Sequence, residues 1–315
     1  MILFWIALAI ALLALLAAYI CYRMAFYSPA RKPFDPNEFN LPEGDEYAAY
    51  RESIKGWIQE MRDMPCEEFE IKSFDGLTLR AKYYEYAPGA PIELMFHGYR
   101  SSGERDLCGG IKRCRKLGRS SLIVDQRGCG RSDGNVITFG VNEHRDCLSW
   151  VNFMVEHFGP DVKILLCGIS MGAATVTIAA GQPLPANVIG ALADCGYTSA
   201  RDMIEKTIGE MKLPPKLMFP FVKLGAKLFG KFDLEAVTPL EAVTHATVPI
   251  IFIHGEADNF VPCWMSQKNF DACSGKKAIL TIPEAAHGLS YLTQPAEYRQ
   301  ALADFFGPDA SATIL

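Results

Sequence analysis

The sequence has no excess of positive charge and no closely spaced cysteine pairs. Lysine and arginine number 31 against 36 aspartate and glutamate residues, so the 315-residue chain has a net charge of −5. A protein that binds phosphate backbones needs a basic excess, so we expect no nucleic-acid partner. The ten cysteines are scattered without any C-x-x-C pair, which argues against zinc and dithiol redox sites and favours a reducing compartment.

Charge is also absent from residues 2–22, which form an apolar run of about the length that crosses a bilayer as a helix. A cleaved signal peptide is the alternative, but it would carry basic residues before the run, and here Met1 is followed directly by Ile2. The basic residues Arg23, Arg31 and Lys32 come after it. By the positive-inside rule, we expect a single-pass anchor over residues 1–23 with the following domain in the cytoplasm.

Residues 24–66 are predicted to hold a linker and one amphipathic helix. The stretch 28–42 is rich in proline and polar residues, as linkers are. Between Asp45 and Met64, apolar side chains recur at helical spacing: Tyr47, Tyr50, Ile54, Trp57, Ile58 and Met61. We expect this helix to pack on the following domain, because its mixed charges lack the basic face of a membrane-surface helix.

The hydrophobic content of 50% allows one large core, and residues 67–307 alternate strand and helix patterns. A hairpin with Asp75-Gly76 at its turn comes first, and strands are then predicted at 92–96, 121–125, 162–167, 188–193, 248–254 and 278–282. Helices are predicted between most of these strands. The pattern predicts an α/β fold with a mostly parallel sheet covered on both faces, followed by a short polar tail at 308–315.

Residues 198–245 interrupt this alternation with a helical stretch that is crowded with large apolar side chains and broken by prolines. An insertion after a sheet strand is a natural position for a lid. We therefore expect a helical lid in which Phe219, Phe221 and Leu224 line an apolar substrate pocket. The alternative is that these side chains only form the contact between the lid and the domain below it.

The chemistry is centred on the stretch GISMG, Gly168 to Gly172. A short apolar strand precedes it and a helix of small residues follows, so Ser170 is expected at a sharp strand-to-helix turn that pushes its hydroxyl outward. The Met171 amide then lies at a helix N-terminus, where it can donate to a developing oxyanion.

A serine nucleophile needs a histidine base and a carboxylate that orients the histidine. Loops after two later strands supply these residues as Asp258 and His287, in the chain order expected for a nucleophile elbow on this kind of sheet. Glu256, two residues before Asp258, and Asp194, at the end of an earlier strand, are the alternative acids.

Five segments together resemble the serine hydrolases of the α/β-hydrolase fold, and the chain is similar to the membrane-anchored bacterial Bem46-like and serine-aminopeptidase-like hydrolases. The segments are His97-Gly98-Tyr99, residues 125–132, the Ser170 turn, residues 254–262, and Ala286-His287-Gly288. The resemblance covers residues 68–306. It implies that the Tyr99 amide is the second oxyanion donor and that Asp258 is the acid, and it leaves His97 a structural loop residue.

The expected activity is hydrolysis of a carboxylic ester that carries an apolar acyl or alkyl group, on a small or lipid-like molecule, by Ser170, His287 and Asp258. No cofactor or metal is expected, since this acyl transfer needs neither. An aminopeptidase-like amidase or a thioesterase on the same triad is the alternative, because fold analogy does not separate these substrates. A noncatalytic binding protein of the same fold is the rival from another class.

Overall fold

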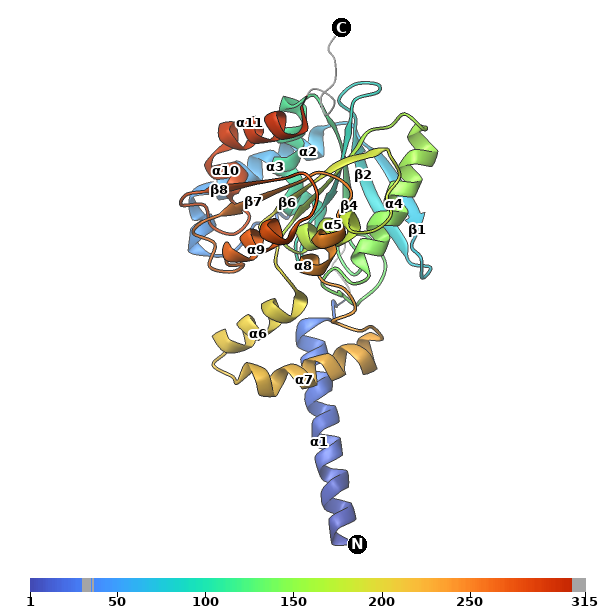
Figure 1. The fold of residues 1–315 in the computed structure, drawn as a ribbon, viewed down its shortest axis with the longest axis vertical. Coiled ribbons are helices and arrows are strands. Elements are labelled where there is room, and N and C mark those ends of the chain that lie inside the picture. Colours follow the sequence, from blue (N-terminus) through green and yellow to red (C-terminus); the bar gives the residue numbers. More distant parts are fainter. Residues whose placement is uncertain (30–34, 36, 308–315) are drawn as a thin grey trace.

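The computed structural model describes residues 1–29, 35 and 37–307. The predicted tail at 308–315 and part of the predicted linker lie outside the described residues. Figure 1 shows a rounded α/β domain with the long N-terminal helix projecting from one end of it.

Eight strands form one sheet in the order β1-β2-β4-β3-β5-β6-β7-β8. The first two strands pair as an antiparallel hairpin, β2 is antiparallel to β4, and the remaining neighbours are parallel, which confirms the predicted sheet. The strands are β1 (Glu67–Lys72), β2 (Thr78–Tyr84), β3 (Ile92–Phe96), β4 (Ser120–Asp125), β5 (Ile164–Ile169), β6 (Val188–Asp194), β7 (Ile250–Gly255) and β8 (Lys277–Ile282).

Helices cover both faces of the sheet (Figure 1). Apolar side chains fill the two layers between the helices and the sheet. One face carries α2 (Arg51–Asp63), α3 (Gly103–Lys116), α10 (Ser290–Thr293) and α11 (Pro295–Phe306). The other carries α4 (Glu143–Phe158), α5 (Met171–Ala180) and α9 (Trp264–Ala272). The parallel strands are apolar on both sides because helices bury both faces, as their sequences predicted.

The predicted anchor is helix α1 (Ile2–Ala25), and its last turns pack against the insertion after β6. The insertion contains α6 (Ala200–Glu210), α7 (Pro215–Gly225), a π-helical turn η2 (Ala226–Gly230), α8 (Pro239–Ala242) and a 3₁₀ turn η3 (Val243–His245). A Cβ atom on Gly225 would lie 2.4 Å from the carbonyl oxygen of Ala18, so the lack of a side chain there lets α7 approach the backbone of α1.

The segment before the sheet differs from the single helix expected over Asp45 to Met64. It begins as a 3₁₀ turn, η1 (Asp45–Tyr50), and continues as α2, which buries Ile54, Ile58 and Met61. The expected packing is present, because these three side chains join the core layer that α3 and α11 share. The tighter first turn brings Tyr47 close to the loop that holds His287, to which its hydroxyl donates a hydrogen bond.

Candidate active site

Ser170 lies at the turn between β5 and α5, with φ 57° and ψ −118°, a conformation that costs energy for a residue with a side chain. The flanking glycines make this turn possible. A Cβ atom on Gly168 would lie 2.0 Å from the carbonyl oxygen of Gly172, and one on Gly172 would lie 2.0 Å from that of Phe96. The backbone of β3 therefore closes on the turn and holds the serine in its strained position.

Three side chains from separate loops meet in a hydrogen-bonded chain. His287 Nε2 lies 3.0 Å from Ser170 Oγ, and His287 Nδ1 lies 2.7 Å from Asp258 Oδ2. Because an ionised carboxylate only accepts, Nδ1 carries the proton and Nε2 presents its lone pair to the serine hydroxyl. This tautomer is the one in which histidine can remove a proton from serine.

The carboxylate of Asp258 is buried and still held in its ionised form. Burial alone would raise its pKa, but contacts with His254 and His287 outweigh that effect and lower the pKa to about 2. The other carboxylate oxygen, Oδ1, accepts hydrogen bonds from the amides of Phe260 and Val261. The two amides therefore hold Oδ1, while Oδ2 contacts the imidazole of His287.

His254 is the residue at this site that the sequence did not single out. It is fully buried at the end of β7, with Nε2 2.8 Å from the carbonyl oxygen of Val261 and 3.3 Å from Asp258 Oδ2. A carbonyl can only accept, so Nε2 is the protonated nitrogen, and Nδ1 accepts from the Ser266 hydroxyl at 2.6 Å. The sequence offers only a histidine at the end of a strand, four residues before Asp258, as a signal for this contact, and that spacing does not by itself predict it.

Neither alternative acid contacts His287. Glu256 accepts a hydrogen bond from the Thr281 hydroxyl at 2.7 Å. Asp194 accepts from the hydroxyls of Tyr298 and Ser290, and burial raises its pKa. Of the three candidate carboxylates, the structure brings only Asp258 to the imidazole.

The two expected oxyanion donors flank the serine. Gly98 is close enough that a Cβ atom on it would lie 3.4 Å from Ser170 Cβ, so the loop after β3, which continues into Tyr99, runs directly past Ser170. Within the described residues, no hydrogen-bond acceptor is assigned to the amide of Tyr99 or of Met171. Neither amide is therefore paired in the described structure, which is what an oxyanion donor requires.

His97 stabilises this loop and takes no part in the chain of three. Its Nε2 accepts from the Gln126 amide at 3.1 Å, and its Nδ1 donates to the carbonyl oxygen of Gly98 at 2.7 Å. Burial lowers its pKa, which favours the neutral ring that this pattern requires.

Comparisons with known proteins bear on the fold. Residues 94–223 match the α/β hydrolase fold. YqkD of Bacillus subtilis is 26% identical over 190 residues, which cover 60% of this chain and 62% of YqkD. Protein bem46 of Schizosaccharomyces pombe is 25% identical over 249 residues, 77% of each chain. The Pyrococcus furiosus esterase Pf2001 superposes with a TM-score of 0.65 at 19% identity, covering 89% of this chain and 97% of the esterase. The chain has the α/β-hydrolase fold.

The structure has a cavity of about 370 Å³ that opens beside Ser170 and His287. Its walls come from the sheet, from α3 and α10, and from the segment that begins at Pro42 and runs through η1 into α2. The apolar side chains around it are Ile54, Trp57, Met95, Leu107, Leu192 and Leu292, among others. The segment Pro42–Trp57, which we call the cap, is therefore what covers the pocket.

The side chains that were expected to line the pocket lie elsewhere. Phe219 is buried in the cluster that contains Tyr22 and Phe26, while Leu224 is exposed on the outer side of α7, and none of Phe219, Phe221 and Leu224 borders the cavity. The insertion at 198–245 is apolar because it packs on α1. In this structure the insertion therefore supports the N-terminal helix and does not cover the pocket as a lid.

One group of possible metal ligands occurs in the described part of the chain: Cys195, Asp258 and His287, whose ligand atoms lie within 4.8 Å of one another. Burial raises the pKa of Cys195 well above its ordinary value, which disfavours the thiolate that a metal needs. Asp258 and His287 already bond to each other. These observations argue against a metal site at the three residues. The absence of a metal stays a prediction.

Proposed function

We propose that this protein is a serine hydrolase that cleaves carboxylic esters with an apolar acyl or alkyl group. The hydrogen-bonded chain from Asp258 through His287 to Ser170 is the observation that carries the proposal. The apolar walls of the cavity beside Ser170 support an apolar group in the substrate.

In the proposed reaction, Ser170 Oγ attacks the carbonyl carbon while His287 Nε2 takes the hydroxyl proton. The amides of Tyr99 and Met171 bind the oxygen that becomes negatively charged. His287 then returns the proton to the leaving alcohol as its C–O bond breaks, which leaves an acyl group on Ser170. Water, activated in the same way, releases the acid and restores the serine.

Labelling by a fluorophosphonate tests this mechanism. The probe phosphonylates a serine only if the serine is activated, so we expect stable labelling of the native chain and none of Ser170→Ala. His287→Ala should lose labelling as well, while folding as judged by circular dichroism is retained. A native chain that folds but is not labelled would favour the noncatalytic binding protein.

The substrate class is tested by comparing p-nitrophenyl esters of graded chain length with thioesters and aminoacyl anilides. We expect the highest kcat/KM on an ester with an apolar acyl chain. Faster turnover of anilides or thioesters would retain the triad mechanism but assign an amidase or thioesterase.

We also propose that α1 anchors the protein with its catalytic domain in the cytoplasm. Among the described residues, α1 is the one helix that is long and apolar enough to cross a membrane, and a signal sequence would pass the same test. Arg23 follows its apolar part, as the positive-inside rule requires for this orientation. Protease should digest the domain in inside-out vesicles, and protection there would refute the orientation.

A further inference from the structure

The segment Met211–Lys231, which we call the basic hairpin arm, has an unusual composition for an acidic protein. It carries five lysines and no aspartate or glutamate. Four of the lysines are followed directly by leucine, at positions 212–213, 216–217, 223–224 and 227–228. Cations and large apolar side chains therefore alternate along the same stretch.

Both kinds of side chain are exposed on the arm. The leucines show large exposed fractions, 41% for Leu213, 64% for Leu217, 36% for Leu224 and 47% for Leu228. The opposite side of the arm, with Phe219, Val222 and Ala226, is buried in the cluster that contains Tyr22 and Phe26 at the end of α1. The exposed leucines are thus not part of the packing between the arm and α1.

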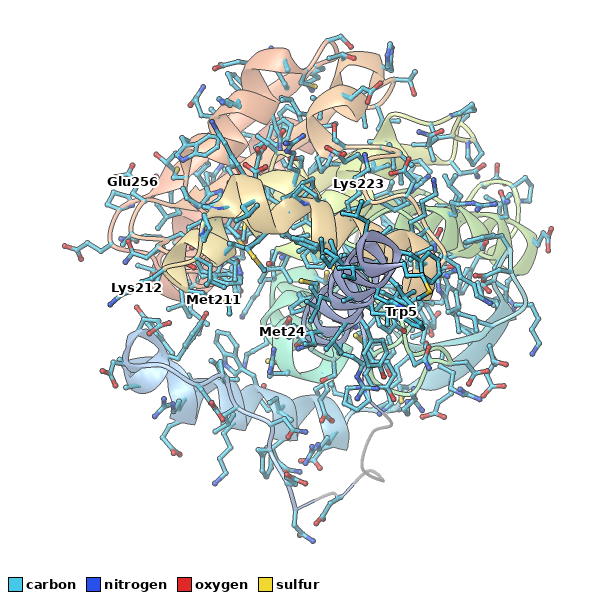
Figure 2. All side chains as sticks on the ribbon, turned by 90° about the horizontal axis from the view of Figure 1, so that it is seen from below. Trp5, Met24, Met211, Lys212, Lys223 and Glu256 are labelled. Atoms are coloured by element: carbon cyan, nitrogen blue, oxygen red, sulfur yellow. The ribbon has the colours of Figure 1, made fainter. Side chains whose placement is uncertain are left out.

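The arm lies on the end of the molecule from which α1 leaves. Figure 2 looks onto this end and shows Lys223 on α7 near α1, with Met211 and Lys212 at the turn between α6 and α7. Lys223 forms an ion pair with Glu235. Lys212, Lys216 and Lys227 are exposed as well.

The length of α1 indicates how deep the arm must lie if α1 crosses a membrane. Residues 2–17 precede the first buried residue, Ala18, and at ~1.5 Å per residue they extend about 24 Å. The apolar layer of a bilayer is about 30 Å thick. The remaining few ångströms must come from the turn of α1 that packs against the arm, so the arm reaches the boundary of the bilayer.

We propose that the basic hairpin arm docks on the surface of an anionic bilayer, in the leaflet from which α1 emerges. Leu213, Leu217, Leu224 and Leu228 enter the boundary between headgroups and acyl chains, and the neighbouring lysines contact lipid phosphates. Side chains with this distribution bind membrane surfaces through apolar burial and through attraction to anionic lipid. This inference rests on insertion of α1 and is independent of the proposed esterase activity.

Docking of the arm would also bring α6, and the cavity wall beside it, toward the lipid. Lys206 on α6 lies 5.9 Å from the ring of Phe260, and that ring lies 5.0 Å from the ring of His287. Phe260 also borders the cavity. One wall of the cavity therefore lies next to α6, the helix that leads into the arm.

Photo-crosslinking of the full chain in lipid vesicles tests the docking. A benzophenone amino acid replaces Leu217 or Leu228 in the arm, Leu12 in α1 as the control for insertion, and Gln300 on α11 as the control for solvent. The vesicles contain phosphatidylcholine alone or with phosphatidylglycerol. We expect Leu12 to attach to acyl chains in both, Gln300 in neither, and the arm positions about fivefold more in the anionic vesicles.

A charge reversal separates specific docking from mere proximity. Lys212→Glu, Lys216→Glu and Lys227→Glu together should abolish the anionic enhancement at Leu217. The matched control reverses Lys116, Lys163 and Lys276, which come just before β4, β5 and β8 at the other end of the sheet, and should leave the enhancement unchanged.

Three results would overturn the proposal: attachment at Leu12 without lipid adducts at the arm, adducts of the arm with a protein, including a second copy of this chain, or no attachment at Leu12. Fluorophosphonate labelling of the same samples reports Ser170 separately. If the arm does not crosslink to lipid while Ser170 is still labelled, the docking proposal is refuted and the proposed serine hydrolase activity is unaffected.

Discussion

Gly172 shows how tightly the nucleophile turn is built. Any Cβ atom at this position would meet the backbone of Phe96, which cannot move without disturbing β3. We therefore expect Gly172→Ala to shift the turn and to lower both the free energy of unfolding, by about 1–3 kcal/mol, and the rate of fluorophosphonate labelling, by more than about tenfold.

The control for this substitution is Gly56→Ala on the exposed side of α2, where a Cβ atom meets nothing within 4 Å. Alanine at that helical position should raise the free energy of unfolding by about 0.5–1 kcal/mol and leave labelling unchanged. Urea unfolding of both variants gives the comparison. Equal behaviour of the two alanines would mean that the turn tolerates a side chain.

His254 is expected to position Asp258 without contacting substrate. His254→Phe retains an aromatic ring at this position but removes the hydrogen bonds of the imidazole with Val261 and Ser266 and its contact with Asp258. We expect kcat to fall by about tenfold with KM nearly unchanged, because a misplaced acid weakens a base that acts mainly in the transition state. His144→Phe, which removes a histidine contact with the Gly140 carbonyl, should leave both constants intact. A change in KM alone would contradict the positioning role.

The residues proposed for catalysis could be named from the sequence because their chemistry is local and their chain order is characteristic. The turn around Ser170 needs glycines at two fixed positions, and Asp258 and His287 each follow a strand by a short loop. His254 was missed because a histidine at the end of a strand is usually a buried structural residue. Its contact with Asp258 depends on how the loop folds back, which spacing alone does not reveal.

At the scale of elements, α1 is joined directly to the loop that carries an expected oxyanion donor. The Tyr99 hydroxyl donates to the carbonyl oxygen of Ala25 at 2.8 Å, and Arg100 donates to those of Met24 and Tyr27. These carbonyls lie at the end of α1, where the helix itself leaves acceptors free. The N-terminal helix therefore holds the backbone on which the Tyr99 amide depends.

We expect Tyr99→Phe to lower kcat about threefold to tenfold, the effect of losing one hydrogen bond worth about 0.5–1.5 kcal/mol, with little change in KM. Tyr197→Phe is the matched control, since its hydroxyl also donates to a backbone carbonyl, that of Phe139. Steady-state kinetics of both variants on the same ester test the coupling. Equal losses in the two variants would assign the effect to packing.

The cap covers the pocket, a role that the sequence suggested for the insertion. Periodicity identified the apolar stripe of 45–64 and the apolar crowding of 198–245, but it could not say what each would face. The aromatic side chains of the insertion have α1 as their partner, a contact between segments about two hundred residues apart. Such long-range contacts leave no local signal in the sequence.

For the molecule as a whole, the free energy of unfolding at acidic pH should depend on a buried group of charged residues between the sheet and α3. Glu93 on β3 pairs with Arg113 on α3 and with Arg119 before β4, the latter at 2.7 Å. Burial alone would raise the pKa of Glu93, but the two guanidinium groups lower it to about 2. Its ionisation therefore stabilises the fold above its ordinary pKa of 4.5, and that stability is lost as the pH falls toward 2.

Glu93→Gln removes the negative charge that faces two buried guanidinium groups, so we expect it to reduce the free energy of unfolding at pH 7 by about 3–5 kcal/mol. The difference from the native chain should narrow as the pH falls from 4.5 toward 2, because the native carboxyl then becomes neutral too. Glu70→Gln, in an exposed pair with Arg80, should change stability by less than about 1 kcal/mol. A difference that does not vary with pH would rule out the ionic explanation.

The hydrogen bonds between α1 and the loop at Tyr99 also bear on how this protein should be prepared. Removing the first 28 residues, a common step to obtain a soluble sample, would delete the acceptors of Tyr99 and Arg100 and uncover the aromatic side chains of the insertion. Activity measured on such a fragment would be that of a protein in which the loop at Tyr99 has lost these hydrogen bonds. Detergent or nanodisc samples of the intact chain are the material on which turnover should be measured.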